Sequence, residues 1–239
     1  DPYRTVWNWK NSFINVRISN FKIGFHWSSP DPLDGNTHGY GSETTFIHCK
    51  FRNCLLSILQ ENMQSRNNNF FATDIENDDS GELYTMIQDR AGGHFAFFGG
   101  SIIGRGHIFE YIYPDGGSNL WGAGNITFNA CEFEMRSTTN NEYIKQLPSS
   151  RLNRSAVAKI SLINSRINSF NQEKSLIKYT GHTLINIDNT NVLVGGKLYI
   201  EQVPVAGSSG YIPYSYGIAT IENSDGFFYK ENLDDTEYG

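Results

Sequence analysis

Four acidic residues form two pairs with the same internal spacing. Asp74 and Glu76 are one pair, Glu132 and Glu134 are the other, and Arg105 lies between the pairs in the sequence. Residues i and i+2 of a strand point to the same side, so each pair would present two carboxylates together. Two carboxyl groups flanking a glycosidic bond are the requirement of glycoside hydrolysis. We therefore predict acid–base cleavage, with one pair supplying the acid, the other the base, and Arg105 orienting the substrate.

A short sequence repeat indicates which structural elements position these side chains. The hexamer apolar-x-(Asn or small)-x-x-apolar recurs about every 24 to 34 residues, which is the period of a solenoid. A loose pattern recurring by chance in a β-sandwich is the alternative interpretation. The regular order and spacing favour the solenoid, with copies that begin at Ile18, Phe46, Phe70, Phe98, Phe128, Leu162, Ile187 and Ile221.

The third place of the hexamer indicates a sharp bend between two strands of one coil. Most of its residues are of types that tolerate left-handed backbone angles or carry a small side chain. Stacked strands lie about 4.8 Å apart, so equivalent Asn side chains can form a hydrogen-bonded ladder while the flanking apolar residues face one interior. The eight third-place residues are Asn20, His48, Ala72, Gly100, Ala130, Asn164, Asn189 and Asn223.

Stacking the hexamers also predicts which outward side chains are neighbours. The fifth places give the column Lys22, Lys50, Asp74, Ile102, Glu132, Arg166, Asn191 and Asp225. The next outward column is Gly24, Arg52, Glu76, Gly104, Glu134 and Asn168, with Arg105 beside Gly104. The two carboxylate pairs would then be roughly 9.6 Å apart, near the upper limit for an inverting glycosidase. The alternative is a ladder of ion pairs between oppositely charged neighbours, which needs no function.

Composition narrows the classes of protein further. The 239 residues show no abrupt shift in composition, which predicts a single domain over residues 1–239. A net charge of −6 argues against a nucleic-acid partner, and the absence of a long apolar run argues against membrane insertion. The three cysteines are predicted to be buried, unpaired thiols. The histidines lack metal-ligand spacing, so we expect no metal and no other cofactor.

In its repeats, from Val16 to Phe228, the chain resembles the right-handed parallel β-helix proteins, the class of pectate-lyase-like enzymes and bacteriophage tailspikes. The first residues, Asp1-Pro2 without Met, suggest a piece of a longer modular chain. The resemblance implies an all-β, right-handed parallel β-helix of about eight coils with long inter-coil loops. It also implies a homotrimer in a virion tail or outside the cell, with other tail proteins and a bacterial surface polysaccharide as partners.

Sugar binding requires flat aromatic faces beside polar side chains. Segments between the repeats supply both, and burial of the same aromatic residues against another subunit is an equal alternative. The predicted substrate-binding residues are Trp27, His107, Tyr111, Tyr113, Trp121 and Tyr214. Three functions remain open: a tailspike that binds and cleaves polysaccharide, a non-enzymatic receptor-binding shaft, and a secreted polysaccharide lyase or hydrolase.

Overall fold

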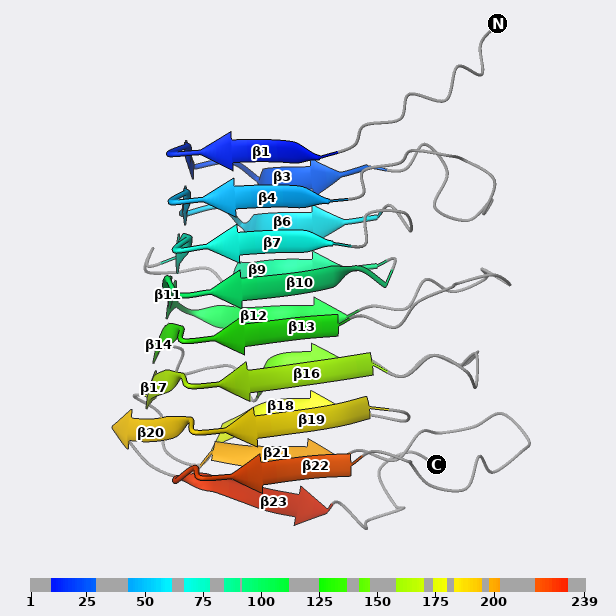
Figure 1. Ribbon diagram of the computed structural model, residues 1–239, viewed down its shortest axis with the longest axis vertical. Coiled ribbons are helices and arrows are strands. Elements are labelled where there is room, and N and C mark those ends of the chain that lie inside the picture. Colours follow the sequence, from blue (N-terminus) through cyan, green and yellow to red (C-terminus); the bar gives the residue numbers. More distant parts are fainter. Residues whose placement is uncertain are drawn as a thin grey trace, which may run out of the picture.

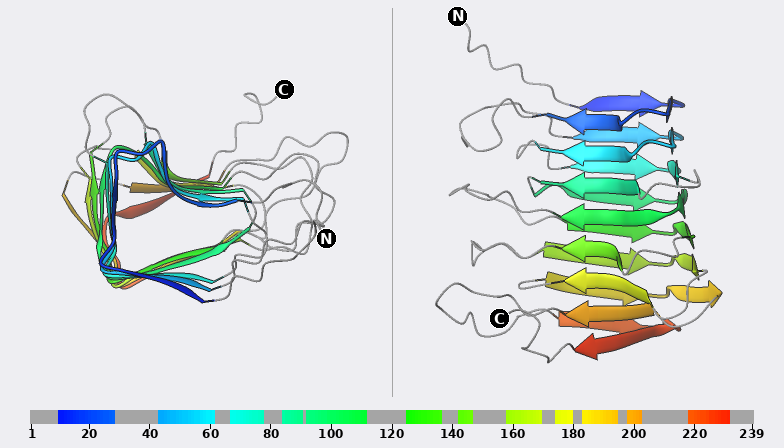
Figure 2. Two further views of the ribbon diagram at one scale, coloured as in Figure 1. Left: turned by 90° about the horizontal axis from the view of Figure 1, so that it is seen from above. Right: turned by 180° about the vertical axis from the view of Figure 1, so that it is seen from behind.

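The computed structural model of the chain is a parallel β-solenoid, so the predicted all-β fold class is confirmed (Figure 1). It describes residues 10–28, 43–61, 67–77, 84–90, 92–111, 125–136, 142–146, 158–169, 174–179, 183–194, 198–202 and 218–231. Three parallel sheets surround the interior on three sides, as the view from above shows (Figure 2). We call them the front, side and rear sheets from their places in Figure 1. Among the described residues, no helix is long and apolar enough to cross a membrane.

Each coil adds one strand to each sheet in turn, and successive coils pair in parallel. The front sheet contains β1 (Asn11–Ile14), β4 (Thr44–Ile47), β7 (Asn68–Phe71), β10 (His94–Phe98), β13 (Asn125–Asn129), β16 (Ala158–Ile163), β19 (Thr183–Asp188) and β22 (Ile218–Glu222). The side sheet contains β2 (Arg17–Ser19), β5 (Lys50–Arg52), β8 (Asp74–Asn77), β11 (Ser101–Gly104), β14 (Glu132–Met135), β17 (Arg166–Ser169) and β20 (Asn191–Val194). The rear sheet contains β3 (Ile23–Trp27), β6 (Leu56–Gln60), β9 (Tyr84–Asp89), β12 (Gly106–Tyr111), β15 (Glu142–Gln146), β18 (Lys174–Tyr179), β21 (Leu198–Gln202) and β23 (Phe227–Glu231).

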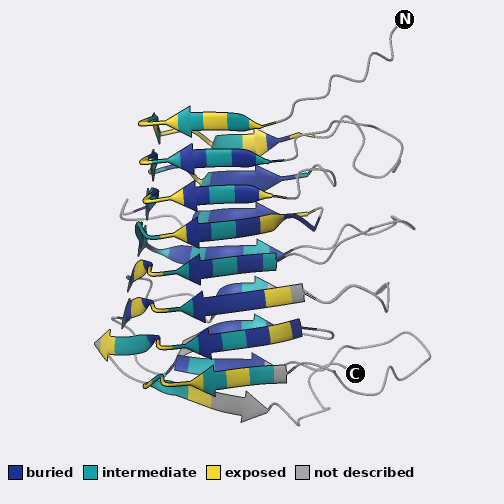
Figure 3. Cartoon of the chain, in the orientation of Figure 1, coloured by how far each residue is buried: buried dark blue, intermediate teal, exposed yellow. Residues whose placement is uncertain are grey.

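The interior is a column of stacked apolar side chains, one from each front strand. The rings of Phe13, Phe46, Phe70, Phe97 and Phe128 stack in order, with centroids 5.0, 4.9, 4.2 and 5.1 Å apart. Leu162 and Ile187 continue the buried column in later coils. Figure 3 shows this interior as buried residues alternating along the front strands, with more exposure in the first and last coils.

The bend predicted at the third place of the hexamer is present in every copy. All eight residues have positive φ, from 44° at Ala72 to 88° at Gly100. The predicted Asn ladder forms in the later coils, where Asn189 donates to Asn164 at 2.8 Å between side chains. The hexamer therefore marks true corners of the coil.

Two copies of the repeat were assigned to the wrong place. In the first coil Asn15, not Asn20, turns from the front to the side sheet, and Asn20 lies at the next corner. In the fourth coil Gly99 is equivalent to Ala72 and Ala130, because its N–H continues the same hydrogen-bonded row. Local sequence did not reveal this shift, since both corners tolerate the same left-handed residue types.

A ladder of small polar side chains follows the front corner inside the coil. The ladder residues are Cys49, Thr73, Cys131, Ser165, Thr190 and Ser224. In its later part each backbone N–H donates to the hydroxyl one coil further on, from Cys131 to Ser165 at 3.2 Å and from Ser165 to Thr190 at 3.2 Å. Each hydroxyl or thiol in turn donates to a carbonyl of the corner, which satisfies the polar groups that the bend leaves behind.

The cysteines confirm the prediction of buried, unpaired thiols, since Cys49, Cys54 and Cys131 are all buried and free. Burial raises the pKa of the Cys131 thiol from 9.0 to about 12, although hydrogen bonds to the Asn129 and Gly99 carbonyls oppose the shift. Because thiolate is the reactive form, we expect the native protein to resist thiol reagents that label it once unfolded.

The same thiol makes stability fall at alkaline pH. Between pH 9 and pH 12 the unfolded chain loses the Cys131 proton while the folded chain keeps it, so folding becomes less favourable as the pH rises. Urea unfolding at about pH 8 and about pH 11 should show a smaller alkaline loss in Cys131→Ser, which keeps a ladder hydroxyl like Ser165. An equal loss in both proteins would contradict this cause.

Candidate functional site

The predicted acidic residues lie on the outer face of the side sheet, but the residues between the two pairs differ from the expectation. Glu132 is the register partner of Ser101, and Glu134 is the partner of Ile103. Gly104 and Arg105 were expected there, and that placement is wrong. The fourth coil bends at Gly99, so each β11 residue lies one place later in the repeat than the hexamer indicated, with Ser101 in the column expected for Ile102 and Ile103 in the column expected for Gly104.

Three of the four carboxylates are already held by partners. Asp74 Oδ1 accepts from the Ser101 N–H at 2.9 Å and from its hydroxyl at 2.7 Å. Glu76 pairs with Lys50 at 2.7 Å and more loosely with Arg52 at 3.7 Å.

The second carboxylate pair is arranged differently. Glu134 is bound by Arg136 through Nη2 at 2.6 Å and Nε at 2.8 Å. Glu132 is exposed and is the register partner of Arg166, although these two described residues form no ion pair. Glu76 and Glu134 therefore take part in ion pairs, which fits the alternative interpretation better than the prediction of an unpaired catalytic acid and base.

Two of the predicted sugar-binding aromatic residues belong to the core. Trp27 is 6% exposed, packs edge-on against Phe25 at 4.7 Å and donates from its indole N–H to Thr44 Oγ1 at 3.1 Å. Tyr111 is 4% exposed. Neither ring is presented to a ligand on the surface, which corrects the expectation for both. Tyr113, Trp121 and Tyr214 lie outside the described residues.

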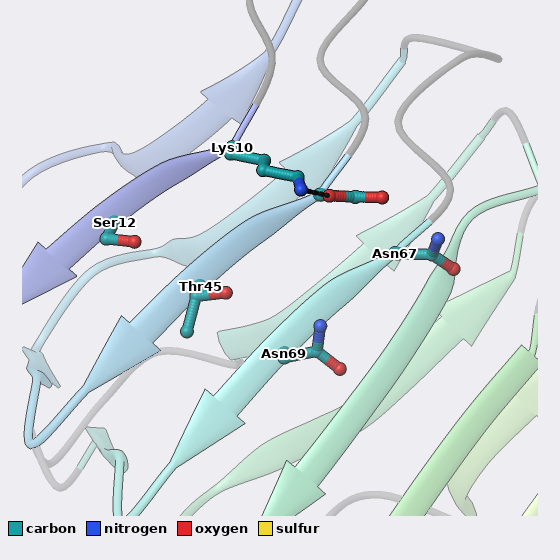
Figure 4. Close-up of a pocket in the computed structure, with 6 residues that line it drawn as sticks. Lys10, Ser12, Thr45, Asn67 and Asn69 are labelled. Carbon is teal, nitrogen blue, oxygen red and sulfur yellow. Dashed lines mark ion pairs between the residues drawn. The ribbon is translucent and has the colours of Figure 1, made fainter.

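The first coils form a polar hollow on the outer face of the front sheet, which none of the predicted site residues lines. It is lined by Lys10, Ser12, Glu43, Thr45, Asn67 and Asn69. Figure 4 shows these side chains on one face of the sheet, with Lys10 at its edge. The Lys10 ammonium lies 3.8 Å from the Glu43 carboxylate, so the hollow combines charged groups, hydroxyls and amides.

The backbone beside the hollow is held in an uncommon conformation. Lys10 and Glu43 have φ of 56° and 68°, although neither is of a type that favours the left-handed region. Each such residue costs about 1–2 kcal/mol in isolation. Lys10 and Glu43 occupy equivalent places directly before β1 and β4, so two successive coils repeat this conformation at the edge of the hollow.

An apolar row runs beside the hollow on the same face. It consists of Ile14, Ile47, Phe71 and Phe98, which are register partners on four successive strands. Phe71 and Phe98 are 41% and 40% exposed, and their rings stack at 5.0 Å with 13° between their planes. Ile14, Ile47 and Phe71 each lie two residues beyond a hollow residue of their own strand. The backbone positions of Phe71 and Asn69 are therefore about 7 Å apart, and Phe98 extends the aromatic pair onto the next strand.

The sequence did contain a signal for this face. The aromatic doublets Phe70-Phe71 and Phe97-Phe98 each put one ring inside and one outside, because neighbouring residues of a strand point to opposite faces. A column drawn through the second place of the hexamer passes through Ile47 and Phe71. The predicted charged columns pass through the fifth and later places, so they do not contain this row.

The front face thus presents charged, hydroxyl and amide groups beside an exposed apolar row. Comparison with protein-family models, curated proteins and solved structures found no match. The chain is a parallel β-solenoid whose front sheet carries aromatic and polar side chains on its outer face.

Proposed function

We propose that the chain is a polysaccharide-binding β-solenoid that holds an extended glycan on the front sheet. The observation that carries this proposal is the exposed Phe71–Phe98 stack beside the polar hollow. A pyranose ring has an apolar face that packs on an aromatic ring and a rim of hydroxyls that needs donors and acceptors. Groups of both kinds lie on the outer face of the front sheet over the first four coils, which supports the proposal.

Binding is better supported than cleavage. A hydrolase needs one carboxyl group as acid and one as base around the scissile bond. Asp74, Glu76 and Glu134 are instead engaged by Ser101, by Lys50 and by Arg136. The front hollow has one carboxylate, Glu43, and its partner there is Lys10.

In its biological setting we propose a tail appendage of the tailspike kind, which recognises a bacterial surface polysaccharide as a trimer. The β-solenoid supports this setting because a stack of parallel coils is a rigid scaffold for an extended ligand. A receptor-binding shaft without affinity for sugar is the alternative. In that case the ion pairs of the side sheet would stabilise the shaft, and the exposed aromatic rings would have no function.

Affinity electrophoresis in gels containing capsular or cell-wall polysaccharides tests the proposal. We expect at least one polymer to retard the protein, and we expect the double variant Phe71→Ala/Phe98→Ala to bind about tenfold more weakly. Thr45→Val keeps the side-chain shape, loses a hydroxyl of the hollow, and should weaken binding less.

Phe228→Ala is the matched control, because Phe228 is also 41% exposed but lies on β23 of the rear sheet. It should bind like the wild type. If no polymer retards the wild type, or if Phe228→Ala loses as much affinity as the double variant, the front face is not a glycan site. If the wild type shortened the polymer and either Glu76→Gln or Glu134→Gln abolished that shortening, hydrolysis would be established instead.

A further inference from the structure

The two ends of the solenoid leave strand edges unpaired among the described residues. The first coil supplies the outermost strand of every sheet, β1, β2 and β3, and each of these pairs only with the coil after it (Figure 1). At the other end β22 and β23 pair only with the coil before them. An unpaired edge presents backbone N–H and C=O groups that can hydrogen-bond another strand. Both ends are therefore surfaces to which a further coil can be added.

The apolar interior is open at the same two ends. Phe13, the first ring of the interior stack, is only half-buried, whereas its register partner Phe46 in the second coil is 1% exposed. Ile18 of the first coil is also only partly buried against the core. At the opposite end Ile221 is half-buried, although its register partner Ile187 is fully buried. Stacking another coil would bury this apolar surface, as neighbouring repeats do within a solenoid.

The two ends carry opposite charge. The lysine and arginine residues of the described first coil are all exposed, and they are Lys10, Arg17 and Lys22. The first coil has no acidic residue between positions 10 and 28. Over positions 218 to 228 of the last coil the charged residues are Glu222 and Asp225, and both are exposed. Lys10 lies 3.8 Å from Glu43, but Arg17 and Asp225 form no ion pair with any described residue.

The sheet register puts these two unpaired charges at opposite ends of one column. Arg17 begins the outward column of the side sheet, which continues through Lys50, Asp74, Ser101, Glu132, Arg166 and Asn191. Asp225 forms a parallel bridge with Asn191 and is the last member of the column. If the last coil of one molecule stacked on the first coil of another in this register, the backbones of Asp225 and Arg17 would be about 4.8 Å apart. Ile221 would then lie against Phe13 in the interior column.

We propose that a second copy of this chain docks head to tail on the first coil, so that the solenoid continues from one molecule into the next. The last coil of the chain offers what the first coil lacks: parallel strand edges, an apolar residue in the Phe13 column and an acid opposite Arg17. Charge complementarity of this kind fixes the register of an interface. A head-to-tail contact is heterologous, so its copies form an open stack. The contact uses neither the front hollow nor the Phe71–Phe98 stack.

Light scattering of the full chain, coupled to size exclusion over a range of loading concentrations, tests the contact. We expect the mass to rise with concentration beyond that of any one closed oligomer. Arg17→Asp and Asp225→Arg should each weaken association about tenfold, because each variant puts like charges opposite one another. The double variant Arg17→Asp/Asp225→Arg restores opposite charges, so it should associate like the wild type.

Lys159→Asp is the matched control, because it makes the same change of charge on an exposed residue of β16, away from both ends. It should associate like the wild type. A mass that stays constant at all concentrations, whether of a monomer or of a trimer, would overturn the proposal and indicate another occupant of the first coil. A double variant that associates no better than the single variants, or an equal loss in Lys159→Asp, would also overturn it. These outcomes leave glycan binding untouched, since Phe71→Ala/Phe98→Ala tests that function separately.

Discussion

Replacing Phe97 with alanine is expected to lower the free energy of unfolding by about 4 kcal/mol, the range for truncating a fully buried aromatic residue. Phe97 is 0% exposed, and in the interior stack its ring centroid lies 4.2 Å from that of Phe70 and 5.1 Å from that of Phe128. The variant removes one ring from the middle of the stack. The coils on both sides then lose a packing partner, and the rigid sheets cannot close the cavity.

Phe98→Ala is the control, because it removes the same atoms one residue further along. Phe98 is 40% exposed and packs on Phe71 outside the sheet, so we expect a loss below about 1 kcal/mol. Urea denaturation followed by tyrosine and tryptophan fluorescence would measure both variants. Similar losses in the two proteins would contradict the assignment of Phe97 to the interior and Phe98 to the surface.

Replacing Gly100 with alanine is expected to cost a similar amount, about 4 kcal/mol, for a backbone reason. Gly100 has φ of 88°, and a Cβ atom there would lie 2.2 Å from the Thr73 carbonyl oxygen in the preceding coil. The clash is with backbone on the neighbouring strand, so it can be relieved only by separating the coils. The expected loss therefore lies near the upper end of single-substitution effects.

The neighbouring Gly99→Ala tests whether the clash, and not the left-handed conformation, is the cause. Gly99 also has positive φ, at 69°, but a Cβ atom there would meet no atom within 4 Å. Alanine already occupies the equivalent corner position at Ala72 and Ala130. We expect Gly99→Ala to cost about 1 kcal/mol in the same denaturation experiment. Equal costs at the two glycines would show that conformation alone decides.

The front face is the largest difference between the predicted and the observed site. The predicted charged columns contain real neighbours, since Lys50 is opposite Asp74 and Arg52 is opposite Glu76 in the sheet register. The columns do not show that the Lys50 side chain pairs with Glu76 while Asp74 bonds to Ser101. Side-chain choices between two partners a few ångströms apart depend on local geometry, which a column of residue types does not contain.

The sequence by itself determined the repeat, its corners and its interior. Asn, Gly, Ala and His at the third place all adopt the left-handed conformation, because an abrupt bend between strands demands that backbone angle wherever the chain turns. The apolar residues around each bend fill one column for the same local reason. Phe46, Phe70 and Phe128 are interior residues as the pattern predicts.

The tertiary structure alone decided the register of two coils and the residues that share the functional face. Asn15 and Asn20 both occupy corners, so the sequence could not tell which one begins the side sheet. Phe97 and Phe98 are chemically identical, and only pairing with β7 and β13 puts one inside and the other beside Phe71. Because adjacent residues of a strand face opposite sides, a shift of one residue exchanges core and surface.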